Sequence, residues 1–367
     1  MLHSIGRLLL LLLWFGSLPP LRAQERRIVV GTDLGVELVN ALEVQISPEF
    51  LKDSATDPYL FSTTRLMRVS YNHFAPFREH AAVKRTKALT DKIGTGVYLL
   101  PLFYEGFPRP RRHSPVSREL LEALHPNADS AARMADEYMR LAGQFYQDAR
   151  FADFQRRYRR VYDMAIAQVQ RNLPPSNFIP TMEAYYGARK AAYRIIVNPF
   201  FKSQWGMAWQ VAGPKGFTAV QITAPAGEQT LARGRVANAG FDDAEWVRNL
   251  SVHEFGHTFV NPLTALPAFA PGIAAQQALY RPIPDQAQYR DWGTSFNEHL
   301  VRAGEVRIAL ALGRPEVSSK LRADYAAWMY LPFFEAQLQR YEANRQRYPT
   351  LESFLPEIIG ALPTLAK

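Results

Sequence analysis

The segment His253-Glu254-Phe255-Gly256-His257 has the residue types and the spacing of a zinc site, H-E-x-x-H. Two histidines four residues apart on a helix lie on one face, about one turn from each other. Their imidazole nitrogens can therefore converge on one Zn²⁺ at roughly 2.0–2.1 Å. Glu254 follows the first histidine, where its carboxylate can take a proton from a metal-bound water. The segment predicts His253 and His257 as metal ligands and Glu254 as a catalytic base.

The residues around this segment predict the helix that it needs. Asp242 or Asp243 can cap the N-terminus, and apolar side chains recur at helical spacing through the motif. Asn261-Pro262 predicts the end of the helix, because proline has no N–H to donate and its ring clashes with the preceding turn. The motif is therefore expected inside a buried helix.

A catalytic zinc site has three protein ligands, so one more is required. No H-x-x-G-x-x-H extension follows His257, which excludes the three-histidine version of the motif. Glu298 is the favoured third ligand. It falls in the first turn of a predicted helix that Thr294 or Ser295 would cap and that would run to about Gly313.

Two other side chains of that helix are alternatives to Glu298. His299 is the rival ligand, but neighbouring residues of a helix point about 100° apart, so only one of the two can face the metal. Glu305 is a weaker alternative, and it is expected to be a solvated surface carboxylate.

An HExxH helix followed by a glutamate ligand on a later helix resembles the gluzincin metallopeptidases typified by thermolysin. Four groups of segments together resemble the bacterial family described as domain of unknown function 4932, which has a gluzincin-like zinc signature. They are Tyr71–Phe74 with His80–Lys84, His253–Pro262, Asn297-Glu298 with Val301–Ala303, and Tyr341–Thr350 with Phe354–Ile358. The resemblance implies a zincin-like fold in which His253, His257 and Glu298 bind Zn²⁺.

The sequence departs from the thermolysin pattern at one position. In that pattern an acidic residue four places after the ligand glutamate supports a zinc histidine. Here the position holds Arg302, which cannot accept a hydrogen bond. Because zinc histidines nearly always donate their second N–H, Asn297, Asn261 or a backbone carbonyl is expected to accept it instead. Arg302 is expected to pair with a carboxylate or to bind substrate.

The N-terminus predicts an exported protein, periplasmic or extracellular in a bacterium. Residues 1–23 have the form of a signal peptide, with Arg7, an apolar run from Leu8 to Phe15 and a small residue, Ala23, at the expected cleavage site. The run is too short for a stable membrane span. The sequence contains no cysteine, which excludes disulfides and a lipid-modified cysteine.

The formal net charge of +9 raises the question of an anionic partner. The basic residues are scattered, and the only dense groups are at Arg109–Arg112 and Arg156–Arg160. The second group follows a predicted helix and is typical of a solvated face. A nucleic-acid partner is therefore not expected, whereas loose attraction to an anionic bacterial surface is compatible with the charge.

The pattern of apolar residues predicts an α+β protein that is mainly helical. Residues 24–175 are expected to form a mainly helical region, and residues 176–367 a zincin-like region. In the second region a small mixed sheet, with strands at 193–197, 207–211 and 217–222, precedes the HExxH helix. The Glu298 helix and C-terminal helices at 321–341 and 351–362 follow it.

These observations favour a zinc-dependent hydrolase, most simply a secreted metallopeptidase that cleaves peptides or proteins through a zinc-bound water. The residues expected to stabilise the oxyanion are Tyr280, Tyr289, His299 or Arg302. The alternative is a secreted zinc-binding or scaffold protein that performs no turnover. A purely structural zinc is disfavoured, because such sites usually have four cysteine or histidine ligands. The sequence predicts neither a specificity pocket nor an oligomeric state.

Overall fold

The computed structural model describes residues 28–46, 64–232, 235–283 and 289–366. The expected signal peptide, residues 1–23, lies outside these ranges. Within them the protein is an α+β structure, mainly helical, with a small mixed sheet, and this confirms the coarse fold class. In this part of the chain, none of the helices combines the length and the apolar character that crossing a membrane requires.

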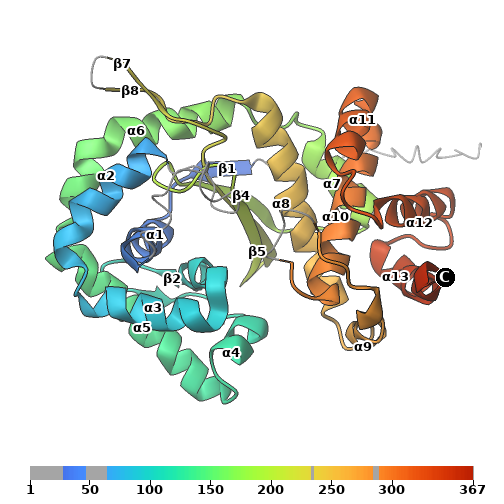
Figure 1. Cartoon of the computed structure of the whole chain (residues 1–367), viewed down its shortest axis with the longest axis horizontal. Coiled ribbons are helices and arrows are strands. Elements are labelled where there is room, and N and C mark those ends of the chain that lie inside the picture. Colours follow the sequence, from blue (N-terminus) through green and yellow to red (C-terminus); the bar gives the residue numbers. More distant parts are fainter. Residues whose placement is uncertain (1–27, 47–63, 233–234, 284–288, 367) are drawn as a thin grey trace, which may run out of the picture.

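A four-stranded sheet lies in the middle of the molecule, with helices on both sides (Figure 1). Its spatial order is β1 (Ile28–Gly31), β4 (Ala192–Val197), β6 (Gly216–Thr223) and β5 (Gly206–Gly213). The first three strands are parallel, and β5 is the antiparallel edge strand. The strands predicted at 207–211 and 217–222 are therefore present, and they form a hairpin. Because β1 pairs with β4, strands from both expected regions, 24–175 and 176–367, build the sheet.

The two faces of the sheet pack into two different hydrophobic clusters, because successive side chains of a strand point to opposite faces. On β4, Tyr193, Ile195 and Val197 belong to a cluster with the helices of the second half of the chain. Ile196, between them, belongs to a cluster with the helices of the first half. All four side chains are buried, so the sheet is the shared wall of both cores.

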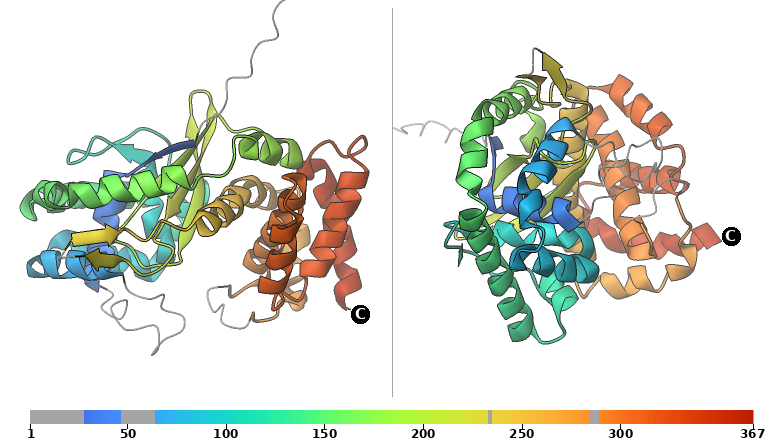
Figure 2. Two further views of the ribbon diagram at one scale, coloured as in Figure 1. Left: turned by 90° about the horizontal axis from the view of Figure 1, so that it is seen from above. Right: turned by 60° about the vertical axis from the view of Figure 1, so that its left-hand side comes forward.

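The layer on one face comes from the first half of the chain (Figures 1 and 2). It contains α1 (Leu34–Ile46), α2 (Arg65–Phe74), α3 (Ala81–Ile93), α4 (Arg118–Leu124), α5 (Ala128–Asp148) and α6 (Phe151–Arg171). Helices α5 and α6 are separated by a break at which Arg150 adopts a left-handed conformation. Helix α4 begins after Ser117, whose side chain caps it by accepting from the Leu120 N–H.

The layer on the other face comes from the second half of the chain. It contains α7 (Phe178–Tyr186), α8 (Ala244–Thr264), α9 (Ala270–Ala274), α10 (Trp292–Ala311), α11 (Pro315–Asp324), α12 (Leu331–Ala343) and α13 (Leu351–Ala361). Two small hairpins, β2 (Tyr104–Glu105) with β3 (Arg111–Arg112) and β7 (Thr230–Ala232) with β8 (Arg235–Asn238), lie outside the sheet. Short 3₁₀ turns occur at Ala75–Phe77, Gly94–Tyr98, Leu100–Phe103, Gln277–Leu279 and Leu362–Ala366. Helix α8 packs against β5 and β6 on one side and α10 on the other.

The prediction that α8 ends at Asn261-Pro262 is wrong, because the helix continues to Thr264 with Pro262 inside it. A proline at this position leaves the carbonyl of Thr258, four residues earlier, without its helical donor. The ammonium group of Lys190 takes over this role and donates to the Thr258 carbonyl oxygen at 2.6 Å. Lys190 also donates to Gln210 of β5 at 2.8 Å, and so it links the helix to the edge strand.

Candidate metal centre

Helix α8 brings the two histidines of the motif together. Its N-cap is Asp243, one of the two predicted caps, whose side chain accepts from the Trp246 N–H at 2.9 Å. One turn separates His253 from His257, and their Nε2 atoms lie 3.1 Å apart. Both imidazoles are largely buried, with 14 % and 11 % of the side chains exposed. Two nitrogens that face each other this closely suit a shared cation between them.

Glu298 reaches the same point from α10. Its Oε1 lies 3.2 Å from His257 Nε2, and its Oε2 lies 3.7 Å from His253 Nε2. Helix α10 begins earlier than predicted, at Trp292, because Asp291 caps it by accepting from the Thr294 N–H. Two ligands of a tetrahedral Zn²⁺ lie roughly 3.3–3.4 Å apart, given bonds of about 2.0–2.1 Å. The three side chains therefore have the spacing that a metal ion requires.

The outer nitrogen of each imidazole faces an oxygen acceptor. His253 Nδ1 lies 2.5 Å from Glu305 Oε1, and His257 Nδ1 lies 3.1 Å from Asn261 Oδ1. A carboxylate and an amide oxygen accept here, so each Nδ1 carries a proton and each Nε2 is directed at the common point, where a bound metal ion would replace any proton on it. Asn261 was one of the predicted acceptors. The expectation that Glu305 is solvated is wrong, because this side chain is 1 % exposed.

Glu305 supports His253 by accepting its Nδ1–H. In the thermolysin pattern the acidic residue with this role stands three positions earlier, where this chain has Arg302. Glu305 follows Glu298 by seven residues, which is about two turns, so both carboxylates lie on one face of α10. The Tyr325 hydroxyl donates to Glu305 Oε2 at 2.6 Å and holds the carboxylate in place. The seven-residue spacing from Glu298 is visible in the sequence and could have indicated that Glu305 faces the site. No sequence pattern indicates Tyr325, because it reaches the site only through the packing of α11 against α10.

The charges of the site favour a cation at the common point. Burial alone would lower the pKa of His257, but the Glu298 carboxylate beside it raises this pKa to about 9. Burial would raise the pKa of Glu298, yet His257, His253 and Arg302 together hold it well below its ordinary value. Glu298 is thus ionised, and it attracts positive charge to the space between the two imidazoles.

Arg302 forms the outer wall of the site. Its Nη2 lies 3.5 Å from Glu298 Oε2, and its guanidinium carbon lies 4.2 Å from the centre of the Trp328 ring and 4.6 Å from that of Tyr325. Arg302 therefore pairs with a carboxylate, one of its two expected roles. The ion pair and the aromatic rings together fix the orientation of Glu298.

The side chain of Glu254 lies beside the histidines in close contact with the edge strand. It is 5 % exposed, and burial raises its pKa, while the two neighbouring histidines act in the opposite direction. It makes no hydrogen bond with any residue that the structure describes. A Cβ atom built on Gly206, at the start of β5, would lie only 2.4 Å from Glu254 Oε1. Glycine is therefore required at this point for the carboxylate to occupy its position.

His299, the rival ligand, lies outside the cluster of metal ligands. His299 is buried against the rings of Trp328, Tyr330 and Phe334, and its Nδ1 lies 2.7 Å from the Ser295 carbonyl oxygen. Burial lowers its pKa to about 4, so its imidazole is neutral. The Tyr280 hydroxyl donates to the Tyr289 carbonyl oxygen.

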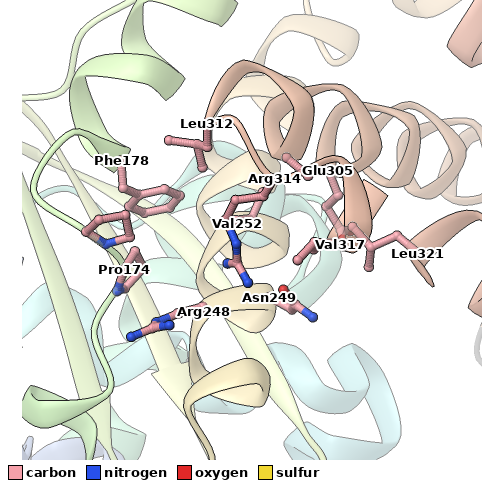
Figure 3. Close-up of a pocket in the computed structure, with 12 residues that line it drawn as sticks. Pro174, Phe178, Arg248, Asn249, Val252, Glu305, Leu312, Arg314, Val317 and Leu321 are labelled. Atoms are coloured by element: carbon pink, nitrogen blue, oxygen red, sulfur yellow. The ribbon is translucent and has the colours of Figure 1, made fainter. Parts of the chain in front are cut away.

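A small cavity lies on the other side of α8 from the sheet, next to Glu305 (Figure 3). Apolar side chains line much of it, among them Phe178, Leu312 and Val317. Its volume of about 20 Å³ is enough for roughly one water molecule. This cavity is too small for a substrate, whereas His257 also lines a larger pocket that it shares with residues of β5.

Replacing Glu305 by glutamine is expected to weaken zinc binding by about tenfold or more. The charged partner of His253 is lost, and removal of such a partner typically costs 10- to 100-fold in metal affinity. Competition titrations with a chromophoric chelator would measure the change. Glu316→Gln, at an exposed position on α11, is the control. Equal affinities in wild type and Glu305→Gln would show that Glu305 does not support the site.

Comparison with known proteins identifies the family to which the chain belongs. No curated protein and no solved structure matches the chain significantly. One family does match, over residues 119–361, which is more than half of the chain and includes α8 and α10 with the whole histidine and glutamate cluster. The chain therefore belongs to the family described as a domain of unknown function (DUF4932).

Proposed function

We propose that this protein is a zinc-dependent hydrolase, a metallopeptidase of the gluzincin type on a zincin-like fold. The observation that carries the proposal is the convergence of His253, His257 and Glu298 on one point with the Glu254 carboxylate beside it. Three protein ligands and an adjacent base are the composition of a catalytic zinc site rather than a structural one.

The donor set fits Zn²⁺. Glu298 Oε2 is buried and has no hydrogen-bond partner among the described residues, although a buried carboxylate oxygen normally has one. The two Nε2 atoms also face this space, 3.1 Å from each other. A dication satisfies all three groups at once. When bound, Zn²⁺ lowers the pKa of a coordinated water to about 7 and polarises a carbonyl group.

The protein's own residues supply the remaining chemistry. Glu254 accepts a proton from the attacking water and later returns it to the leaving amine. Glu305 and Asn261 keep the imidazoles in the tautomer that binds metal. Arg302 keeps Glu298 aligned.

The edge strand supports a peptide as the substrate. In the described part of the chain, β5 pairs with β6 on one side only, so its outer backbone groups are open to an extended peptide. A chain added there would form main-chain hydrogen bonds along β5. Because β5 begins at Gly206, beside Glu254, such a peptide would pass the catalytic base.

Chelator-sensitive hydrolysis is the test of this function. Purified protein is expected to contain one zinc per chain and to cleave members of a peptide library, with cleavage lost in a chelator and restored by added Zn²⁺. Elemental analysis and mass spectrometry of the library measure the two parts. Protein that binds zinc but cleaves nothing would favour the non-catalytic alternative. Protein without zinc would contradict both.

A further inference from the structure

A pocket of about 330 Å³ lies beside the metal ligands, next to His257. Its first wall is the second half of α8, and its second wall is formed by β5 and the start of β6. Its third wall is formed by Phe103 and the segment 115–119, which precedes and begins α4. This volume is near the lower end of ligand pockets, which hold about 300–1,000 Å³, and suits a part of a substrate rather than a whole ligand.

The pocket is lined mainly by apolar groups. Phe103 and Val116 on one wall and Trp209 and Phe217 on the other are the large ones. Phe217 is also one of four large hydrophobic side chains that are exposed among the described residues. Apolar surface left exposed at the mouth of a pocket is typical of a binding site.

The polar groups on the α8 and β5 walls are already hydrogen-bonded within the protein. Gln210 Oε1 accepts from Lys190, the Thr258 hydroxyl donates to the Phe255 carbonyl, and Asn261 Oδ1 accepts from His257. A ligand would therefore gain little by presenting a hydrogen-bond donor to these side-chain oxygens. Arg118 and Glu119 both line the pocket, so their opposite charges offset, and Arg118 also pairs with Glu122 at 2.6 Å. An acidic ligand group would have to lose its hydration on entering a lining that is mainly apolar, and this loss disfavours it.

The third wall comes from a different part of the chain than the metal ligands. Phe103 and Pro115 to Arg118 precede residue 119, where the match to the family begins. The metal site is therefore contained in the matched region, whereas one wall of the pocket is not. The family match therefore says nothing about the contribution of this wall to substrate selectivity.

We propose that this pocket binds a large apolar side chain of the peptide substrate, leucine- to phenylalanine-sized, and excludes acidic ones. The inference rests on the proposed function, because the substrate is placed by its proximity to His257. Phe103, Val116, Trp209 and Phe217 are the residues that determine this specificity.

Binding of amino-acid hydroxamates to the zinc-loaded protein tests the proposal without turnover. The hydroxamate group chelates zinc in every member of the series, so only the side chain differs among the phenylalanine, leucine, alanine and aspartate compounds. Calorimetric titration is expected to show that the first two bind about tenfold or more tightly than the alanine compound. The aspartate compound should bind most weakly.

Two variants place the effect in the pocket. Ala212→Phe adds a ring at an exposed position of the lining and is expected to abolish the preference for phenylalanine over alanine. Phe217→Ala should reduce it, while Met329→Ala, which removes an exposed side chain elsewhere, should not.

The outcomes separate the two proposals. Equal affinity for all four hydroxamates, or a preference unchanged in Ala212→Phe, would overturn the assignment of the pocket and leave the zinc site intact. If no hydroxamate binds, the metal site itself fails, and the assignment of the pocket fails with it.

Discussion

Replacing Glu254 by glutamine is expected to lower peptide hydrolysis by at least about a hundredfold and to leave the zinc content unchanged. Glutamine keeps the size of the side chain but cannot take a proton from water. General acid–base help is worth about 10²–10⁴-fold. The three ligand side chains are untouched by the change, so metal should remain. Steady-state rates and elemental analysis on the same preparation measure both quantities. Wild-type turnover in this variant would rule out Glu254 as the base.

A substitution at Gly206 would displace the Glu254 carboxylate without changing Glu254 itself. In Gly206→Ala, the new Cβ would lie 2.4 Å from Glu254 Oε1, which is too close for any contact between these atoms, so the carboxylate must shift. Hydrolysis is expected to fall with it, because a displacement of about 1 Å at a catalytic group can cost 100-fold. Gly213→Ala, at the other end of β5, is the control, since its Cβ would meet its nearest neighbour at 3.4 Å. Equal losses in both variants would indicate damage to the strand instead.

The parts of the site that the sequence predicts are those encoded by local spacing. His253 and His257 lie one turn apart on any helix, and Asp243 is recognisable as a cap beside the motif. The strands of the hairpin are rich in aromatic and β-branched residues and flank the turn Gly213–Gly216, which is sufficient to predict β5 and β6. Each of these features depends on residues within a few positions of each other.

The parts that the sequence does not predict depend on packing between distant segments. Glutamate is usually a surface residue, and Glu305 is buried only because α10 packs against both α8 and α11. Pro262 is a helix stop by local rules, and Lys190, at a distance of 68 positions from Thr258, removes the penalty by hydrogen bonding to the free carbonyl. The pocket next to His257 likewise joins three segments that no short-range pattern connects.

Removing one of the metal-binding side chains provides the sharpest test of the metal centre itself. A metal ion that binds only the folded protein stabilises it, by about 4 kcal/mol when the concentration of the ion is a thousand times its dissociation constant. Wild-type protein should therefore melt at a clearly lower temperature in excess chelator. His257→Ala should bind no stoichiometric zinc, and its melting temperature should not respond to chelator or to added Zn²⁺.

The informative quantity in this experiment is the change in melting temperature when Zn²⁺ or chelator is added. The melting temperature of the variant alone does not test the site. His257→Ala also leaves the buried Glu298 carboxylate without its main partner, and this alone can cost about 3–5 kcal/mol. A double variant, His257→Ala with Glu298→Gln, removes the unpaired charge and should recover stability without recovering the response to zinc. His125→Ala, outside the site, should respond to chelator as the wild type does. A full zinc-dependent shift in His257→Ala would place the metal elsewhere in the chain and remove the basis of the proposed activity.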